Sequence, residues 1–425
     1  MNDKSFEIRG VTFGEGSPVI AVPVSGKEED ILADISAVRE CADMIEIRMD
    51  GFEELRNPKS VSRLLRRARG AFDGPVLLTL RTRREGGLVD CGDGFYEEVL
   101  TSGIMEGNID LVDVEFAFGQ VARRIADMAR NQSVKVVMSQ HDFHHTPDSG
   151  EILDAFRRMY EMGADIAKGA YIPQDGKDVD EVLAAALAAG REFQMPFALI
   201  SMGEAGRITR TDGETFGSCL TFASAKGKNS APGQIDVMEM REILARRHET
   251  LSERKNVFLI GFMGAGKTSV SEALGDMTGI QVVEMDRRIE EEHGMSIPEI
   301  FERFGEEHFR NLETDLLSKL RDEPPSVVSC GGGAVLRMRN VVCMKGMGRI
   351  VLLDVSAEEV LRRLADEVAY RPNLRERFTV EGIRELQAAR REAYEGAADI
   401  VVSTDGKRVR EIAEEIALRP AGTVL

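Results

Sequence analysis

The stretch NVFLIGFMGAGKTS, residues 256–269, decides the fold of the second part of the chain. Its apolar residues VFLI suit a buried parallel strand, and the residues typical of a phosphate loop follow: Gly261, Gly264, Gly266, Lys267 and Thr268. Backbone N–H groups in such a glycine loop can surround phosphate oxygens at the start of a helix. The alternative is a glycine turn that closes an ordinary βα unit. The stretch predicts a Walker A loop and a nucleotide-binding domain.

Composition supports two soluble globular domains. The 425 residues are 43% apolar and 30% charged, which is enough for two cores, and the formal net charge of -18 argues against nucleic-acid binding. The five cysteines show no C-x-x-C spacing, so neither a disulfide framework nor a zinc site is indicated. No segment has the length of a signal peptide core or a membrane span, and we expect a cytoplasmic protein.

Before the Walker loop, short β-rich runs alternate with amphipathic helical stretches. Eight such runs in about 230 residues predict a (β/α)8 TIM barrel. The runs are 19–24, 44–49, 76–81, 111–116, 135–139, 165–170, 197–201 and 219–223. We place the barrel at residues 1–250 and the nucleotide-binding domain at residues 251–425, with the boundary near Leu251.

Polar residues stand at the C-terminal ends of the predicted barrel strands, where the active sites of such barrels lie. They are Glu46 and Arg48 in EIRMD, Arg81 and Glu85 in TLRTRREGG, His141 in MSQHDF and Lys168 in DIAKGAYIP. A lysine buried in the barrel mouth favours a neutral amine, which can attack a carbonyl, and a nearby histidine can move the protons. Taken singly, Lys168 could extend to solvent and His141 could be a hydrogen-bonded core residue.

Two later loops contribute further polar candidates, Arg210, Ser230 and Gln234. An arginine suits a substrate carboxylate because its planar group makes two charge-assisted bonds to one. The alternative for Arg210 is a solvated loop residue.

Residues 18–234 resemble type I 3-dehydroquinate dehydratase, through EIRMD, REGG, HDF, AKGAYIP, FGSCLTFA and SAPGQ in that order. The resemblance implies that Lys168 forms an imine with the substrate ketone, that His141 moves the proton during loss of water, and that Glu85 supports His141. It also implies that no cofactor or metal is needed. The substrate would contact Glu46, Arg48, Arg81, Arg210, Ser230 and Gln234. Gln140 departs from the aromatic residue that many members have before the histidine.

After the Walker loop, four more strand-like runs predict a small parallel, doubly wound sheet: 281–285, 327–330, 350–354 and 399–403. Asp286 ends a strand and could accept a hydroxyl proton or cap a helix. Three glycines, Gly331 to Gly333, end another strand, where they allow close approach of a substrate or form a tight turn. The stretch AYRPNLRERFTVEG reads as a lid or a surface loop, and Arg390 alone reads as a solvated helix residue.

Residues 256–403 resemble shikimate kinase, through GFMGAGKTS, GMSIPEIF, GEEHFR, CGGGAV, the lid RP and the late R...Y before AD. The resemblance implies that ATP binds Gly264, Ala265, Gly266, Lys267, Thr268, Ser269 and Arg371. It also implies that Thr268 holds Mg2+ and that Lys267 and Asp286 are catalytic. Shikimate would contact Asp286, Arg310, Gly331, Gly332, Gly333 and Arg390. Glu284 stands where the family commonly has the first Asp of Asp-x-Asp, from which we expect altered metal handling, and RPNL departs mildly from RPLL.

Together these features predict a bifunctional enzyme that dehydrates 3-dehydroquinate and phosphorylates shikimate with ATP and Mg2+. The chain has no G-x-G-x-x-G motif, so we expect a separate shikimate dehydrogenase to supply the step between the two reactions. We expect no nucleic-acid or membrane partner, and we consider a homodimer formed through the barrel. The alternatives are a non-catalytic sensor of pathway metabolites and a Schiff-base aldolase joined to another small-molecule kinase.

Overall fold

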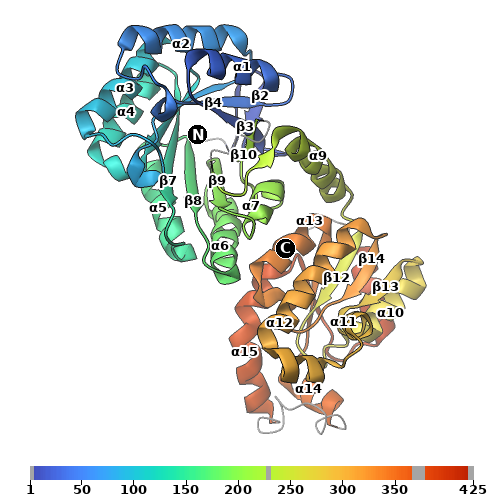
Figure 1. Ribbon diagram of the computed structural model, residues 1–425. Helices are drawn as coiled ribbons and strands as arrows, with labels where there is room; N and C mark the ends of the chain where they lie inside the picture. The colour runs from blue at the N-terminus through green and yellow to red at the C-terminus, as the bar shows by residue number, and fades with distance from the viewer. Residues whose placement is uncertain (1–3, 226–230, 366–378, 420–425) are drawn as a thin grey trace. The chain divides into compact units, whose positions relative to one another are not determined.

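The computed structural model describes residues 4–225, 231–365 and 379–419. The chain divides into two compact units, Met1–His248 and Glu249–Leu425, and each has its own sheet (Figure 1). The division falls inside helix α9 (Val237–Glu253), which also contains the predicted boundary at Leu251. No helix within the described ranges is long and apolar enough to cross a membrane.

Eight parallel strands with surrounding helices form the first unit, which confirms the predicted TIM barrel. The strands are β3 (Val19–Val24), β4 (Met44–Arg48), β5 (Val76–Thr79), β6 (Leu111–Glu115), β7 (Lys135–Asp142), β8 (Ile166–Tyr171), β9 (Phe197–Ser201) and β10 (Leu220–Ser224). β10 pairs with β3, and a bridge between Phe197 and Ser218 joins β9 to the segment before β10, which closes the ring. The short strand β11 (Ile235–Asp236) extends β10 on one side.

Helices cover the outside of the barrel, because each strand is followed by a segment with one apolar face. They are α1 (Glu28–Val38), α2 (Pro58–Ala71), α3 (Asp93–Glu106), α4 (Gln120–Asn131), α5 (Ser149–Glu161), α6 (Gly176–Glu192), the short α7 (Arg207–Thr211) and α8 (Gly213–Phe216), and α9. In α4, for example, Val121, Ala122, Ile125 and Ala129 are buried, a spacing that places them on one helix face.

A hairpin closes the N-terminal end of the barrel. Its strands β1 (Phe6–Ile8) and β2 (Val11–Phe13) pair antiparallel, and the rings of Phe6 and Phe13 stack with centroids 5.2 Å apart. The hairpin packs on apolar residues from the first halves of the barrel strands, including Met44 and Leu111. The N-terminal end of the barrel is thus filled by apolar side chains, and the polar side chains of the barrel interior lie at the C-terminal end.

Strand alternation turns the polar side chains of that end inward. Asp113 and Glu115 are two residues apart on β6, as are Ser139 and His141 on β7, so each pair shares a face. The register pairs Glu115 with Ser139 and Ser139 with Lys168, which sets these polar residues side by side across three strands.

The second unit is a five-stranded parallel sheet in the order β13-β14-β12-β15-β16, which confirms the predicted P-loop fold. The strands are β12 (Asn256–Ile260), β13 (Gln281–Glu284), β14 (Ser326–Ser329), β15 (Gly348–Asp354) and β16 (Ile400–Ser403). The helices are α10 (Lys267–Thr278), α11 (Met285–His293), α12 (Ile297–Lys319), α13 (Met338–Met347), α14 (Ala357–Leu364), α15 (Val380–Ala397) and α16 (Val409–Leu418).

The Walker loop links the central strand β12 to α10. Gly261, Gly264 and Gly266 have φ angles of 146°, 77° and 90°, which L side chains rarely adopt. Glycine is needed at these positions, and the loop brings its backbone around the start of α10 at the C-terminal edge of the sheet.

Candidate functional site

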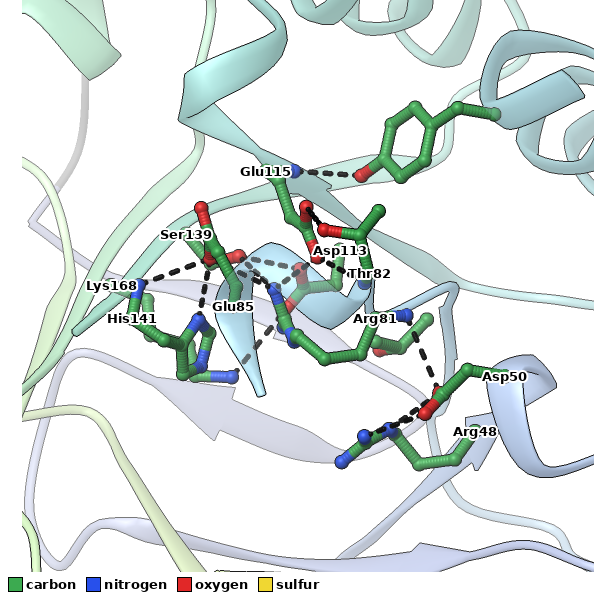
Figure 2. A network of polar contacts seen from close by, with 12 residues as sticks. Arg48, Asp50, Arg81, Thr82, Glu85, Asp113, Glu115, Ser139, His141 and Lys168 are labelled. Carbon is green, nitrogen blue, oxygen red and sulfur yellow. Dashed lines mark hydrogen bonds and ion pairs between the residues drawn. The ribbon is translucent and has the colours of Figure 1, made fainter. Parts of the chain in front are cut away.

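A pocket at the C-terminal end of the barrel gathers the residues predicted for the dehydratase site. Figure 2 shows the polar contacts of five of them, Arg48, Arg81, Glu85, His141 and Lys168. Its lining includes Glu46, Arg48, Arg81, Glu85, His141, Lys168, Arg210 and Gln234. These residues come from strands or loops far apart in the sequence, and the closed barrel brings them together. Ser230, the remaining candidate, lies outside the described residues.

Lys168 is buried in this pocket, with 4% of its surface exposed. Its Nζ lies 3.3 Å from Oδ2 of Asp113 and 4.3 Å from the centroid of the Phe222 ring. A carboxylate on one side and an aromatic face on the other hold the amine in place, and Figure 2 shows it directed toward the middle of the polar cluster.

His141 and Glu85 form a buried hydrogen-bonded pair. Oε2 of Glu85 lies 2.9 Å from Nδ1 of His141 and accepts the backbone N–H of the same residue at 3.0 Å. Burial lowers the pKa of His141 well below its usual value, and the charges of Arg81 and Lys168 add to this effect. Burial raises the pKa of Glu85 to about 8. When Nδ1 donates to Glu85, the other nitrogen of a neutral His141 carries a lone pair and can act as a base.

Arg81 lies at the centre of a buried ion network. It contacts Asp113 at 2.8 Å, Glu115 at 3.2 Å and Glu85 at 3.3 Å, and it donates to Ser139 at 3.0 Å. Burial alone would raise the pKa of Asp113, but the charges of Arg81 and Lys168 bring it below its usual value. The network keeps Asp113 ionised beside the amine of Lys168.

Two further side chains of the pocket are held by hydrogen bonds, Arg48 by the turn that follows its own strand β4 and Glu46 by the adjacent strand β5. Arg48 donates two hydrogen bonds of 2.9 Å to Asp50, and Glu46 accepts one of 2.8 Å from Thr79. Asp50 also accepts the backbone N–H of Arg81 at 3.3 Å. Both residues are therefore held in one orientation.

Arg210 is a buried cation rather than a solvated loop residue. It is 1% exposed, Nη2 donates to the carbonyl of Pro232 at 3.0 Å, and Nε has no hydrogen-bond partner within the described part of the chain. Burial lowers the pKa of Arg210 to about 10. A buried guanidinium with an unused donor on a pocket wall suits an anionic ligand group.

The histidines beyond His141 lie apart from this network. His145 pairs with Asp142 at 2.7 Å on the surface, and the backbone N–H of His144 donates to the same carboxylate. A search of the described ranges finds no group of three or more histidine, cysteine or acidic side chains suited to a metal ion.

In the second unit, Lys267 folds back onto the Walker loop. Its Nζ donates to the carbonyl of Gly261 at 2.9 Å, while Thr268 and Ser269 follow it in the first turn of α10. Arg363 of α14 braces the loop from the other side, donating to the carbonyl of Gly264 at 3.1 Å. The contacts made by Lys267 and Arg363 hold the loop, which includes Gly264, Ala265 and Gly266, around the start of α10.

Asp286 carries a buried oxygen available to a ligand. Its Oδ1 has no hydrogen-bond partner among the described residues, and burial together with the charge of Glu284 raises its pKa to about 6. The helix cap is Glu284 instead, which accepts the backbone N–H of Arg287 at 2.8 Å, so Asp286 lies in the first turn of α11.

Two of the three glycines after β14, Gly331 and Gly333, lie against charged groups. A Cβ on Gly331 would come within 2.5 Å of Oε1 of Glu313 and 2.9 Å of Oδ1 of Asp286, and one on Gly333 would overlap the guanidinium of Arg310. Arg310 is held by Glu313 at 2.8 Å and Glu306 at 2.9 Å. Only glycines leave room for this approach.

Arg390 lies on α15, one helical turn before Tyr394, and its positive charge acts on the Tyr394 hydroxyl. It is therefore partly buried rather than a freely solvated residue. Arg371 of the predicted lid lies outside the described residues.

Residues 20–250 match the sequence profile of the type I 3-dehydroquinase family, which covers more than half of the chain. The chain belongs to this family. It is 39% identical to the 3-dehydroquinate dehydratase of Listeria monocytogenes serotype 4b over 246 residues, 57% of this chain and 97% of that protein. The crystal structure of type I 3-dehydroquinate dehydratase from Clostridium difficile is 37% identical, with a TM-score of 0.57 over 58% of this chain and 99% of that one.

Residues 263–419 match the profile of shikimate kinase. The crystal structure of shikimate kinase from Acinetobacter baumannii is 32% identical and covers 40% of this chain and 94% of that one, with a TM-score of 0.37. Both predicted resemblances are confirmed: a dehydroquinase domain precedes a shikimate kinase domain, and the pair makes a bifunctional shikimate-pathway enzyme.

Several residues of both sites escaped the sequence reasoning. In the dehydroquinase domain they are Asp113, Glu115 and Ser139, and in the kinase domain Glu313 and Arg363. A signal for the first two was present in the run LVDVE, since acidic residues at alternate positions of an apolar strand share one face. Glu313 ends the stretch GEEHFRNLE, which belongs to the kinase resemblance but assigns it no role, and Arg363 lies in an ordinary amphipathic helix without such a signal.

Proposed function

We propose that the dehydroquinase domain eliminates water from 3-dehydroquinate through an imine on Lys168. The observation that carries this proposal is a buried lysine in one pocket with a histidine whose lowered pKa keeps it neutral. The Clostridium difficile relative was crystallised with covalently modified comenic acid, which is in keeping with a covalent route.

In the proposed route, Nζ of Lys168 attacks the ketone carbon and water leaves as the iminium forms. His141 then removes a proton from the carbon next to the iminium carbon. The electron pair of that C–H bond forms the double bond as the hydroxyl group on the following carbon leaves as water, taking a proton from His141. Hydrolysis of the imine restores the amine and releases 3-dehydroshikimate. Asp113 balances the positive charge of the iminium, and Glu85 keeps Nδ1 of His141 occupied.

The remaining residues of the pocket bind the substrate in this proposal. Arg210, with its unused Nε, is assigned to the carboxylate. Glu46, Arg48 and Gln234 are assigned to the hydroxyl groups, and Ser230 is assigned with them on the resemblance alone. Arg81 is not assigned a direct contact with the substrate, because four partners already occupy its guanidinium. Its proposed role is to neutralise the carboxylates of the network.

We propose that the kinase domain transfers the terminal phosphoryl group of ATP to the 3-hydroxyl of shikimate. Asp286 accepts the hydroxyl proton through its unpartnered oxygen, and Lys267 leaves the carbonyl of Gly261 to stabilise negative charge on the phosphates. Arg310, Arg390 and the glycines from Gly331 to Gly333 bind shikimate. Gly264, Ala265, Gly266, Thr268 and Ser269 bind the phosphates, and Arg371 is assigned to ATP on the resemblance alone.

Mg2+ fits the oxygen donors at this site. Thr268 follows Lys267 in the first turn of α10 and offers a hydroxyl oxygen, a donor type that Mg2+ accepts, while the buried Oδ1 of Asp286 is kept for the hydroxyl of shikimate. When bound, Mg2+ neutralises charge on the transferring phosphate. Glu284 is committed to the cap of α11, which supports the expectation of altered metal handling.

The two reactions are separated by a reduction, so a distinct shikimate dehydrogenase is part of this proposal, as is a cytoplasmic location. We also propose that residues 1–250 and 251–425 act as independent domains, and a homodimer through the barrel remains a prediction. A sensor would have lost catalytic residues, whereas Lys168, His141, Lys267 and Asp286 are all present.

The test supplies the full chain with 3-dehydroquinate, ATP, Mg2+, NADPH and an added shikimate dehydrogenase, and follows shikimate 3-phosphate by mass spectrometry. We expect the product only when the dehydrogenase is present. Formation of 3-dehydroshikimate without later phosphorylation would refute the kinase assignment, and absence of both products would favour the sensor.

A further inference from the structure

Tyr394 is a buried side chain at the junction of three segments of the kinase domain. It lies on α15 and is 5% exposed. Its hydroxyl donates to the carbonyl of Gly332 at 2.6 Å and lies 3.3 Å from the carbonyl of Gly261, at the ends of β14 and β12. One hydroxyl therefore meets both strand ends that flank the site.

The hydroxyl also interacts with Arg390, which lies one turn earlier on the same helix. The Tyr394 hydroxyl therefore ties the carbonyl of Gly332 to the turn of α15 that carries Arg390. Burial raises the pKa of Tyr394, which keeps its proton in place throughout the neutral range. The direction of donation toward the backbone is thereby fixed.

Gly332 is the middle residue of a segment without side chains. Its neighbours Gly331 and Gly333 face Asp286, Glu313 and Arg310, so the segment itself must be held through its backbone. The described hydrogen bonds of its carbonyl groups run from Ala334 to Gly331, from Leu336 to Gly333 and from Tyr394 to Gly332. Of these three hydrogen bonds, only the one from Tyr394 comes from a residue outside the segment 331–336.

We propose that Tyr394 is a positioning residue for the phosphoryl acceptor, which sets Arg390 and the glycine segment in one fixed frame. The inference rests on the proposed kinase function, because it assigns both elements to the shikimate half of the site. The hydroxyl acts through its neighbours and touches neither substrate nor nucleotide. The hydroxyl lies closer to Gly332 than to Gly261, so its loss should weaken the binding of shikimate more than the binding of ATP.

The test is Tyr394→Phe in the full chain, which keeps the ring and removes only the hydroxyl. We expect the KM for shikimate to rise about tenfold, as for the loss of one or two buried hydrogen bonds, with kcat and the KM for ATP changed by less than about threefold. Thr278→Val is the matched control. Its hydroxyl donates to the carbonyl of Leu274 at 2.7 Å in α10, away from both substrates, and we expect no change in either KM.

Calorimetric titration with ADP counts the folded kinase domains, so a loss of folded protein is separated from a loss of shikimate affinity. An unchanged KM for shikimate in Tyr394→Phe would overturn the inference. A parallel rise in both KM values and in the dissociation constant of ADP would also overturn it, because that pattern indicates general loosening. A wild-type chain that forms no ADP with shikimate would instead refute the proposed function.

Discussion

The two sites differ in how far their charged groups are satisfied. In the barrel, Arg81 alone meets three carboxylates, and Lys168 and His141 each have a carboxylate partner. In the kinase domain, one oxygen of Asp286 and one of Glu313 are buried without a hydrogen-bond partner among the described residues. In the first site the groups proposed for the chemistry are paired before substrate binds, and Nε of Arg210 is left for a ligand. In the second site the proposed base, Asp286, itself carries the unpaired oxygen.

This contrast follows from the source of the reacting groups, which differs between the two proposed reactions. The barrel reaction uses groups of the protein itself as nucleophile, acid and base, so their positions and protonation states must be fixed in advance. The kinase reaction brings its charge in with ATP, and a glycine loop with a movable lysine can close on it. Four predictions test the difference, from the largest expected effect to the smallest.

The largest effect is expected for Lys168→Ala, which removes the proposed nucleophile. Dehydratase kcat should fall by at least about 10⁴-fold, because no other lysine among the described residues lines the pocket to form an imine. Borohydride added during turnover should trap a reduced adduct on Lys168 of the wild type, detected by mass spectrometry. Full dehydratase activity in the variant, or an unmodified Lys168, would exclude the Schiff-base route.

Lys267→Ala should lower phosphoryl transfer by about 10³-fold, because the charge lost stabilises only ATP phosphates. The dehydratase rate of the same protein serves as its control and should stay unchanged. A tenfold fall in that rate would correspond to about 1.4 kcal/mol of coupling between the domains, which would contradict their independence.

Asp113→Asn should destabilise the barrel by about 3 kcal/mol, since it removes one carboxylate from a buried network that holds two cations. Denaturant unfolding followed by the dehydroquinase activity measures this loss. Asp154→Asn breaks an exposed pair with Arg157 and should cost less than about 1 kcal/mol. Equal losses in the two variants would show that the buried network adds no stability.

The smallest effect concerns pH. Kinase kcat/KM should fall about tenfold per unit below about pH 6, because Asp286 there binds a proton and cannot accept one from shikimate. Dehydratase activity should persist at pH 6, because the pKa of His141 lies well below its usual value.

Glu284→Gln refines this prediction. Its amide oxygen can still cap α11, but the charge that raises the pKa of Asp286 is gone, so the acidic limb should move to lower pH. The measurement is kinase kcat/KM from pH 5 to 8 in the wild type and the variant. If the fall in kcat/KM at low pH occurs at the same pH in both, the group that titrates is not Asp286.

The sequence predicted the fold well, because periodic patterns and the Walker loop report local geometry. β3 and β9 have the predicted bounds, and the other barrel strands differ by one to three residues. β7 runs to Asp142 instead of Ser139, which places His141 within the strand. Strand ends depend on pairing with a neighbour, which a single run of residues does not show.

The candidate sites were predicted less evenly. Residues that touch a ligand stand at strand ends and carry a signal, as Lys168 and Asp286 do. The residues that hold them come from other elements, and which ligand-contacting residue each one holds is seen only once the chain is folded. Asp113 lies inside a predicted strand rather than at its end, and Tyr394 belongs to the motif R...Y without a predicted role. Glu284 caps α11 in place of Asp286, because the helix begins at Met285, which puts Glu284 at the N-cap position and Asp286 inside the first turn.

The closure of the barrel has a consequence for synthesis of the chain on the ribosome. β3 begins at Val19, yet its second neighbour, β10, begins at Leu220, so one edge of β3 has no partner until most of the first unit has been made. Pairing across so great a separation is slow, and an unpaired edge can associate with other chains. The nascent dehydroquinase domain is therefore most vulnerable to aggregation just before β10 emerges. The kinase domain begins to emerge only after the residues that complete the ring have been made.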